Sequence, residues 1–218
     1  MTVNGRTFDS DVPGGVLGQV QAGTMRTRYR GVPFFKSPFD IGLYLQLLSR
    51  LAPRTVIEVG TRFGGSALWF ADMLCAQGVP SPRVIGVDID PQAGFVDPRI
   101  TFLRGDASRL GDVLTRDLLA GLVHPLLVVE DSSHFYEHSK AVLEFFDPWL
   151  HAGDYVVVED GIVSQMPGEI YQRYENGPNR AVAEFLARRG DDYEIDASLC
   201  DHYGRNVTYN PNGWLRRR

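Results

Sequence analysis

The sequence predicts a single α/β domain built on a doubly wound, mostly parallel sheet. Short β-branched runs alternate along the chain with segments whose apolar residues repeat at helical spacing, which is typical of such a sheet. Two of the runs, 126–130 and 155–158, are almost wholly apolar, as expected of strands buried on both faces. The length of 218 residues suits one domain with a sizeable core.

The first part of the chain divides into an arm and the start of the domain. Residues 1–28 carry several glycines and little periodicity, so we expect a loose N-terminal arm followed by a domain at 29–218. The aromatic segment Tyr29–Phe39 would leave apolar surface that a small monomer struggles to cover, which favours a homo-oligomer. A helix begins near Pro38, carries leucines at helical spacing, and is ended by Pro53.

The remaining elements follow in order. Strands are expected at 55–59, 84–88, 100–103, 126–130 and 155–158, with helices between them at 67–76, 110–119 and 138–150. The segment 161–177 has weak periodicity and is expected to form a lid-like loop, in which Tyr171 and Tyr174 either stack on substrate or pack the lid. A helix at 179–189 and two short strands, 193–195 and 206–209, follow, and these strands would pair antiparallel at the sheet edge.

Composition and charge exclude several classes of protein. The net charge of -5 gives no basic footprint, so we expect no nucleic-acid partner. The N-terminus lacks an apolar signal core and no run is long enough to span a bilayer, so we expect no membrane association. Cys75 and Cys200 form neither a metal-binding spacing nor a disulfide framework, which fits a cytoplasmic protein, and Cys75 is expected to be buried.

Two carboxylate pairs stand at the ends of the two most apolar strands. Glu130-Asp131 ends the first, with His134 three residues beyond Asp131, and Glu159-Asp160 ends the second. Because the carboxyl ends of neighbouring parallel strands meet at one sheet edge, Asp131, Glu159 and Asp160 could converge on one hard cation. The other interpretation is that these acids are solvated loop residues or helix N-caps.

The histidines other than His134 give no clear indication of a functional site. His134 and His138 share the spacing of some zinc sites, but the chain shows no closed set of nitrogen and sulfur ligands, so we expect an exposed His138. His124, His151 and His202 have no partner visible in the sequence.

A glycine-rich turn, Gly60–Ser66, joins the first sheet strand to its helix. Such a turn presents backbone N–H groups at a helix N-terminus and lets a ligand approach closely, although it is not the dinucleotide fingerprint. Asp88 ends the second strand, where an acid can accept both hydroxyls of a ribose. Gly105-Asp106-Ala107 follows the third strand and could border an adenine ring. This order matches that of class I S-adenosylmethionine (SAM)-dependent methyltransferases.

The motifs resemble those of the cephalosporin hydroxylase and rhamnosyl O-methyltransferase family, which is related to the macrolide sugar O-methyltransferases. The resemblance runs from about residue 29 to the C-terminus, and its specific motifs are the first turn and the Asp-x-x-His and Glu-Asp pairing. The matching stretches are Gly31-Val32-Pro33, Lys36-x-Pro38-x-Asp40, Glu58–Ser66, Gly86–Asp90, Gly105-Asp106, Glu130–His134, Val158-Glu159-Asp160, Gly177-Pro178, Ala181–Leu186 and Tyr209–Leu215.

The resemblance implies a Rossmann-like class I methyltransferase fold, with a seven-stranded, mostly parallel sheet, helices on both faces and an antiparallel edge strand. It implies SAM and Mg²⁺ as cofactors and methyl transfer to a hydroxyl of a small-molecule acceptor, such as a sugar moiety of a natural product made in antibiotic biosynthesis. In the macrolide sugar enzymes the matching positions make Asp131, Glu159 and Asp160 the metal ligands and His134 the general base. Asp131 is the second candidate for the base.

The expected cofactor site combines the glycine turn with the acids after the strands. We expect SAM to bind in a crevice formed by Glu58, Gly60, Thr61, Arg62, Gly64, Ser66, Asp88, Asp106, Ala107 and Asp131. Two other functions remain open: a non-catalytic SAM-binding subunit of a biosynthetic complex, and a metal-dependent enzyme on the same fold that does not methylate. The presence of all three acids and His134 favours the methyltransferase.

Overall fold

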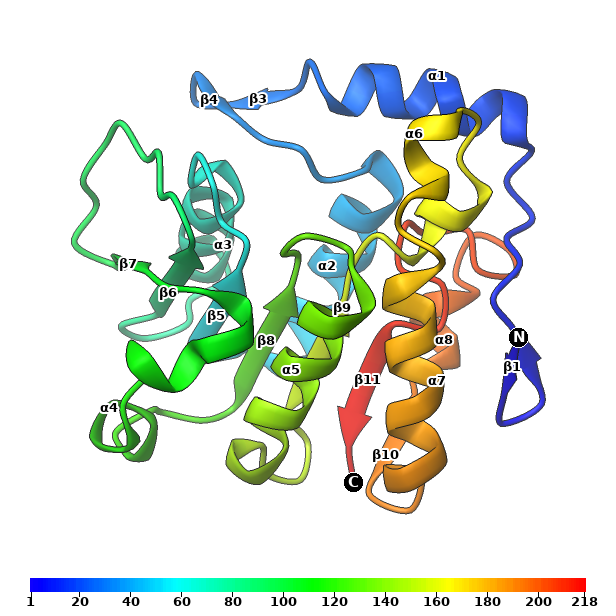
Figure 1. Ribbon diagram of the computed structural model, residues 1–218. Helices are drawn as coiled ribbons and strands as arrows, with labels where there is room; N and C mark the ends of the chain where they lie inside the picture. The colour runs from blue at the N-terminus through cyan, green and yellow to red at the C-terminus, as the bar shows by residue number, and fades with distance from the viewer.

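A seven-stranded sheet, in the order β10-β11-β9-β8-β5-β6-β7, organises the protein (Figure 1). The computed structural model describes all residues from Met1 to Arg218. Five strands are parallel: β5 (Thr55–Val59), β6 (Arg83–Asp88), β7 (Ile100–Arg104), β8 (Leu126–Glu130) and β9 (Tyr155–Val158). At one edge, β11 (Trp214–Arg217) runs antiparallel to both of its neighbours, β9 and β10 (Tyr193–Ile195). The predicted fold class is thus confirmed.

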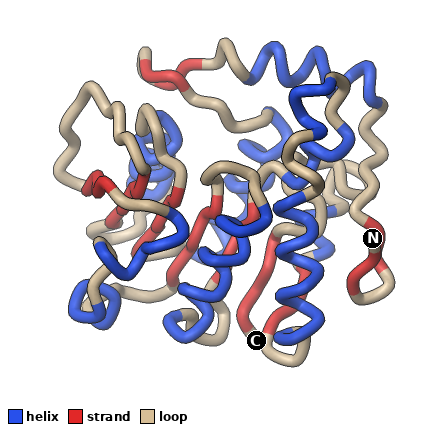
Figure 2. Tube along the Cα trace, in the orientation of Figure 1, coloured by secondary structure: helices blue, strands red, loops and turns tan.

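The helices cover both faces of the sheet. α2 (Pro38–Leu51) and α3 (Gly65–Ala76) lie behind it in Figure 1, while α5 (Tyr136–Phe146), α7 (Gly177–Arg189) and the 3₁₀ helix η1 (Ala107–Asp112) lie in front (Figures 1 and 2). Each face has its own core. Val56 of β5 packs among the residues of α2 and α3, whereas its neighbour Ile57 belongs to the core under α5 and α7. This alternation follows from the two-residue period of a strand.

The N-terminal arm is folded, contrary to the prediction of a loose segment. β1 (Thr2–Val3) and β2 (Arg6–Thr7) form a hairpin, and α1 (Gly14–Thr24) crosses above the carboxyl ends of the parallel strands (Figure 1). Leu17 of α1 is buried with Ile162, Met166 and Tyr209, which lie far away in sequence. The glycine-rich sequence gives little helical periodicity, so the helix depends on this tertiary contact.

The last strand of the sheet is β11 and not the predicted strand at 206–209, which forms turns. β11 pairs with both β10 and β9, and Leu215 lies opposite Ile195 and Val156. Residues 206–209 are held by polar bonds instead: the Asn206 side chain donates to the carbonyls of Thr7 and Asp9, at 2.9 and 3.2 Å. These bonds to the N-terminal hairpin override the local β propensity.

Several smaller boundaries also differ. The predicted helix at 110–119 is split into η1 and α4 (Arg116–Ala120), because Thr115 caps α4 by accepting the N–H of Leu118. The predicted helix at 138–150 is α5 followed by the 3₁₀ helix η2 (Asp147–Trp149). The lid-like segment contains η3 (Gly161–Gln165) and α6 (Glu169–Gln172).

The remaining elements are β3 (Arg28–Tyr29), β4 (Val32–Pro33) and α8 (Ala197–Cys200). Cys75 is exposed and not buried as predicted, because it lies at the outer end of α3.

The aromatic segment 29–39 is covered within the chain. Phe34 is 3% exposed and stacks on Trp69 of α3, with ring centroids 5.8 Å apart. Gly65 at the start of α3 allows this approach, because a Cβ there would lie 2.0 Å from the carbonyl oxygen of Pro33. Tyr29, Phe35 and Phe39 of the same segment are half-buried, so less apolar surface is left than expected, and the homo-oligomer stays a prediction. None of the helices is both long enough and apolar enough to cross a membrane.

Candidate active site

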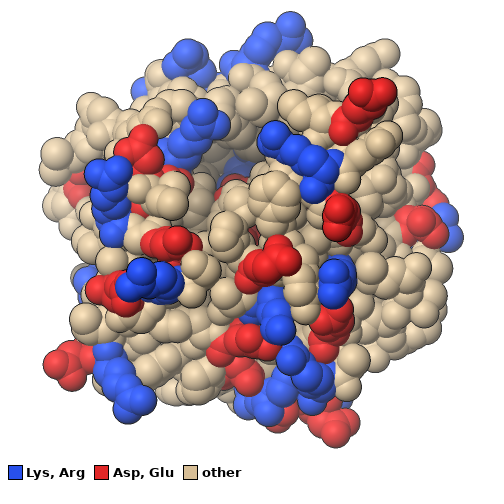
Figure 3. Space-filling model, in the orientation of Figure 1, with Lys and Arg blue, Asp and Glu red and all other residues tan.

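A pocket of about 490 Å³ lies at the carboxyl ends of β5, β6, β8 and β9, beneath α1. The space-filling view shows the molecule hollowed there, with charged side chains around the depression (Figure 3). Most of the predicted site residues line it: Gly60, Thr61, Arg62, Ser66, Asp88, Asp106, Ala107, Asp131, His134 and Asp160. Three predicted residues do not line it, namely Glu58, Gly64 and Glu159.

The glycine turn brings two strand ends into contact. Gly60 has a φ of 102°, and a Cβ on it would lie 1.9 Å from the carbonyl oxygen of Asp131. Only glycine permits this approach of the turn after β5 to the loop after β8. Gly64 has a different role from the predicted one. Its Cα faces Phe102 and Phe95, so it packs the turn against β7 and does not face the pocket.

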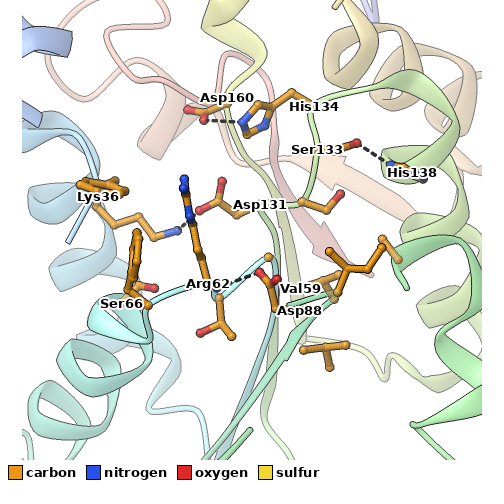
Figure 4. Close-up of a pocket in the computed structure, with 18 of the residues that line it drawn as sticks. Lys36, Val59, Arg62, Ser66, Asp88, Asp131, Ser133, His134, His138 and Asp160 are labelled. Carbon is orange, nitrogen blue, oxygen red and sulfur yellow. Dashed lines mark hydrogen bonds and ion pairs between the residues drawn. The ribbon is translucent and has the colours of Figure 1, made fainter. Parts of the chain in front are cut away.

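Asp88 and Asp106 stand on the side of the pocket formed by β6 and β7. The Asp88 carboxylate accepts the backbone N–H of Arg62 at 2.8 Å (Figure 4) and that of Asp90 at 2.8 Å. Each of its oxygens accepts one of these bonds, so each retains a further lone pair for a ligand. Asp106 caps η1 by accepting the N–H and hydroxyl of Ser108, and these bonds lower the pKa of its carboxyl group.

A buried ammonium group lies among three carboxylates on the opposite side. Lys36 Nζ is 2.7 Å from Asp131 Oδ2, 2.7 Å from Glu159 Oε2 and 3.1 Å from Glu58 Oε1, and the Lys36 side chain is only 3% exposed. Burial alone would lower the pKa of Lys36, but the three carboxylates outweigh it and hold that pKa well above its usual value. No local sequence pattern assigned Lys36 a role beyond its place in a family motif.

The contacts of Lys36 explain why two predicted residues face away from the pocket. Glu159 directs one oxygen to Lys36, and the hydroxyl of Tyr44 donates to the other. Glu58 accepts the hydroxyl of Ser66 at 2.7 Å and lies beneath the glycine turn with no exposed surface. Both acids support the site from below, whereas Asp131 reaches Lys36 and also borders the pocket (Figure 4).

Asp131, His134 and Asp160 converge at the pocket surface. One potential ligand atom from each lies within 4.8 Å of the others, and His134 Nε2 is 3.4 Å from Asp160 Oδ2 (Figure 4). His134 and Asp160 both have left-handed backbones, with φ of 62° and 58°. Such conformations are uncommon outside glycine and often occur at functional sites, where the surrounding structure holds the strain.

Burial changes the protonation of this group. It raises the pKa of Asp131 and of Asp160 to about 7, with added repulsion from neighbouring carboxylates, and it lowers the pKa of His134. The Asp131 and Asp160 side chains are still 22% and 28% exposed, so they can reach a bound ion or substrate. Nδ1 of His134 is buried without a hydrogen-bond partner.

The loop that carries His134 is braced from within. Glu130 is fully buried and accepts hydrogen bonds from the hydroxyls of Ser132 and Ser139, so it fixes both ends of the loop. His138 is half-buried, hydrogen-bonds to the hydroxyl of Ser133 and lines the pocket (Figure 4). The prediction of an exposed His138 is therefore wrong, because α5 begins early enough to turn this side chain back toward the loop.

The roof of the pocket is formed by two segments whose contact with each other and with the pocket was not predicted from the sequence. Tyr171 and Tyr174 of the 161–177 segment line it, and the Tyr174 ring lies edge-on to His134 with centroids 5.4 Å apart. Gln21 and Met25 reach it from α1 and the residue that follows it. Gln21 Oε1 is buried without a hydrogen-bond partner. No sequence signal identified the α1 residues, because they meet the pocket only through the packing of α1.

The fold and site define a class I methyltransferase, and comparisons with known proteins identify the branch. A family model described as "Rhamnosyl O-methyltransferase/CmcI" matches residues 21–218. A rhamnosyl O-methyltransferase of Mycobacterium tuberculosis (strain ATCC 25618 / H37Rv) is 33% identical over 199 residues, covering 88% of this chain and 78% of that protein. The Mycobacterium leprae (strain TN) rhamnosyl O-methyltransferase is also 33% identical, over 88% of this chain and 83% of its own length.

A solved structure described as "cmcI-D160 Mg-SAM" has a TM-score of 0.69 and 28% identity to this chain, covering 89% of this chain and 77% of its own. The chain therefore belongs to the rhamnosyl O-methyltransferase/CmcI family of SAM-dependent O-methyltransferases. The predicted family and enzyme class are confirmed.

The raised pKa of Asp160 predicts how stability changes with pH when divalent cations are removed. An unfolded chain releases this proton near pH 4 and the folded protein near pH 7, so ionisation of Asp160 destabilises the folded state as the pH rises between these values. In EDTA, the wild type should lose stability relative to Asp160→Asn across this window, by at most about 1.4 kcal/mol for each pH unit. Urea unfolding at several pH values measures this, and parallel curves for the two proteins would contradict it.

The position of Lys36 predicts a second effect on stability. Lys36→Met leaves three buried carboxylates without their cation and should destabilise the protein by about 3–5 kcal/mol. Lys140→Met is the matched control, because the only other lysine lies over the Tyr136 ring at 5.7 Å and forms no ion pair. Thermal unfolding with and without Mg²⁺ should show a larger gain from Mg²⁺ in Lys36→Met than in the wild type. Equal stability of the two methionine variants would show that the ammonium is dispensable.

Proposed function

We propose that this protein transfers the methyl group of SAM, with the help of Mg²⁺, to a hydroxyl of a sugar moiety in a natural product. The observation that carries the proposal is the convergence of Asp131, His134 and Asp160 on a pocket that the glycine turn also borders. The curated relatives at 33% identity are described as rhamnosyl O-methyltransferases, which supports a deoxysugar or another polyhydroxylated group as the acceptor.

The pocket residues fit SAM. The turn at Gly60 leaves room for close approach to the backbone, and Asp88 keeps free lone pairs at the end of β6, where a ribose can donate its hydroxyls. Asp106 and Ala107 follow β7 and border the same space. Thr61 adds a buried hydroxyl without a hydrogen-bond partner.

The acids fit a hard cation such as Mg²⁺. Asp131 and Asp160 offer carboxylate oxygens, the ligand type that Mg²⁺ prefers. Burial, with added repulsion from neighbouring carboxylates, raises the pKa of each, and a bound cation would favour their ionised forms. Glu159, the third predicted ligand, contacts Lys36 and Tyr44, is 4% exposed and does not line the pocket, so it would reach the metal only if its side chain moved. When bound, SAM supplies an electrophilic methyl group, and Mg²⁺ acidifies and orients acceptor oxygens.

The protein's own residues provide the base and the surroundings. His134 has a pKa lowered by burial, so its imidazole is neutral near pH 7 and can accept a proton from the acceptor hydroxyl. Asp160, 3.4 Å from Nε2, would stabilise the imidazolium that forms. Asp131 is the alternative base. Tyr171, Tyr174 and α1 cover the pocket, so they would limit the access of water to the reacting groups.

Asp88→Ala should weaken SAM binding through the loss of charge-assisted hydrogen bonds. These are worth roughly 1.5–3 kcal/mol each, which corresponds to about 10- to 150-fold in dissociation constant. Asp90→Ala is the matched control, because Asp90 is exposed and does not line the pocket. Isothermal titration with SAM compares the two variants. If both bind SAM like the wild type, the ribose sits elsewhere.

His134→Ala should retain binding of SAM and Mg²⁺ while turnover falls by roughly the 10²–10⁴-fold typical of a general base. The measurement is methyl transfer to a panel of rhamnosides, with His202→Ala as control because His202 is exposed and outside the pocket. Full turnover of His134→Ala would mean that another group is the base, with Asp131 as the first candidate.

EDTA should abolish methyl transfer, and added Mg²⁺ should restore it. Full activity in EDTA would exclude a catalytic cation.

A further inference from the structure

A second group of metal-binding side chains lies at the opposite end of the strands that carry the active site. His124 comes two residues before β8, and His151 and Asp154 come just before β9. β8 and β9 are paired in parallel, with Leu127 opposite Tyr155, so the segments that lead into them lie side by side. The pocket residues follow the carboxyl ends of these strands. The second group is therefore separated from the pocket by the length of β8 and β9.

Asp154 is the fixed centre of this group. It is 2% exposed and accepts the backbone N–H of Leu126 on one oxygen and that of His151 on the other, both at 2.7 Å. The second oxygen also lies 2.7 Å from Nδ1 of His124. An ionised carboxylate in this position favours the tautomer with the proton on Nδ1, which leaves Nε2 of His124 with a free lone pair. A carboxylate that orients an imidazole in this way is the usual companion of a metal-bound histidine.

His151 completes the group. Its ring stacks on that of His124, with centroids 3.8 Å apart and planes 14° from parallel. The ring is exposed and makes no hydrogen bond within the protein, so its nitrogens are available. One potential ligand atom from each of the three side chains lies within 4.8 Å of the others. Ligands of a tetrahedral zinc ion are about 3.3 Å apart for bonds of 2.0–2.1 Å, so a rotation of the exposed His151 side chain would have to bring one of its nitrogens to that distance from Nε2 of His124.

We propose that the imidazoles of His124 and His151, with Asp154 positioning His124, form a second metal site, which takes a borderline transition ion of the Zn²⁺ class and joins the starts of β8 and β9. Two imidazoles suit Zn²⁺, Cu²⁺ or Ni²⁺, whereas Mg²⁺ requires oxygen ligands, so the ion differs from that of the pocket. The two imidazole donors leave the remaining coordination positions to water. The site does not depend on the proposed function, because none of its residues lines the pocket.

The test uses untagged protein and titrates Zn²⁺ by calorimetry and thermal unfolding. Asp160→Asn removes a pocket ligand, and this variant should still bind one Zn²⁺ and gain stability from it by mass action. Adding His151→Ala, or separately His124→Ala, should abolish both effects. Adding His202→Ala, which removes an exposed histidine elsewhere, should leave them unchanged.

Two outcomes would overturn the proposal. The first is that Asp160→Asn binds no Zn²⁺. The second is that its binding survives both histidine substitutions, which would place the ion elsewhere on the surface. Asp154→Asn gives an independent measure: its effect on the orientation of His124 should weaken Zn²⁺ binding by roughly 10- to 100-fold, as expected for a carboxylate that positions a ligand. Circular dichroism confirms that each variant is folded.

Discussion

The carboxyl edge of the sheet depends on one buried ammonium group. Lys36 Nζ contacts carboxylates that follow or belong to three different strands: Glu58 in β5, Asp131 after β8 and Glu159 after β9. Burying an unpaired carboxylate costs several kcal/mol, so these three acids can lie together only around a positive charge. Lys36 thereby holds three strand ends in one arrangement, and it leaves the outer side of Asp131 open to the pocket.

This arrangement divides the acidic residues into those that support the site from below and those that face the pocket. Glu58 and Glu159 face Lys36 beneath the pocket, while Asp131, His134 and Asp160 face the cavity, where their pKa values are shifted. The roof is assembled separately, from α1 and the 161–177 segment. The family match begins at residue 21, within α1, so the hairpin and the first half of this helix lie outside it. Gln21 and Met25, through which the α1 region lines the pocket, both lie within the matched residues.

Sequence patterns correctly predicted the strands that are buried on both faces of the sheet. The runs of β5, β8 and β9 are apolar because both faces are covered, so their positions and their terminal acids could be read directly. The prediction failed where structure depends on contacts distant in sequence. α1 gains its packing from Leu17 on Ile162, and residues 206–209 give up strand pairing for bonds to the N-terminal hairpin. Neither contact leaves a local periodicity.

The parallel sheet, the glycine turn and the position of the acids and His134 at neighbouring strand ends could all be predicted from local sequence patterns. Strand period and parallel topology place the ends of buried strands at one edge of the sheet. Which of those acids face the pocket depends on contacts that form only in the folded protein. Lys36 is 95 residues from Asp131 and 123 from Glu159, so no local pattern could show that its charge draws Glu159 inward. Packing buries the Lys36 ammonium group beside some of the acids and leaves the others at the pocket. This division therefore exists only once the chain has folded.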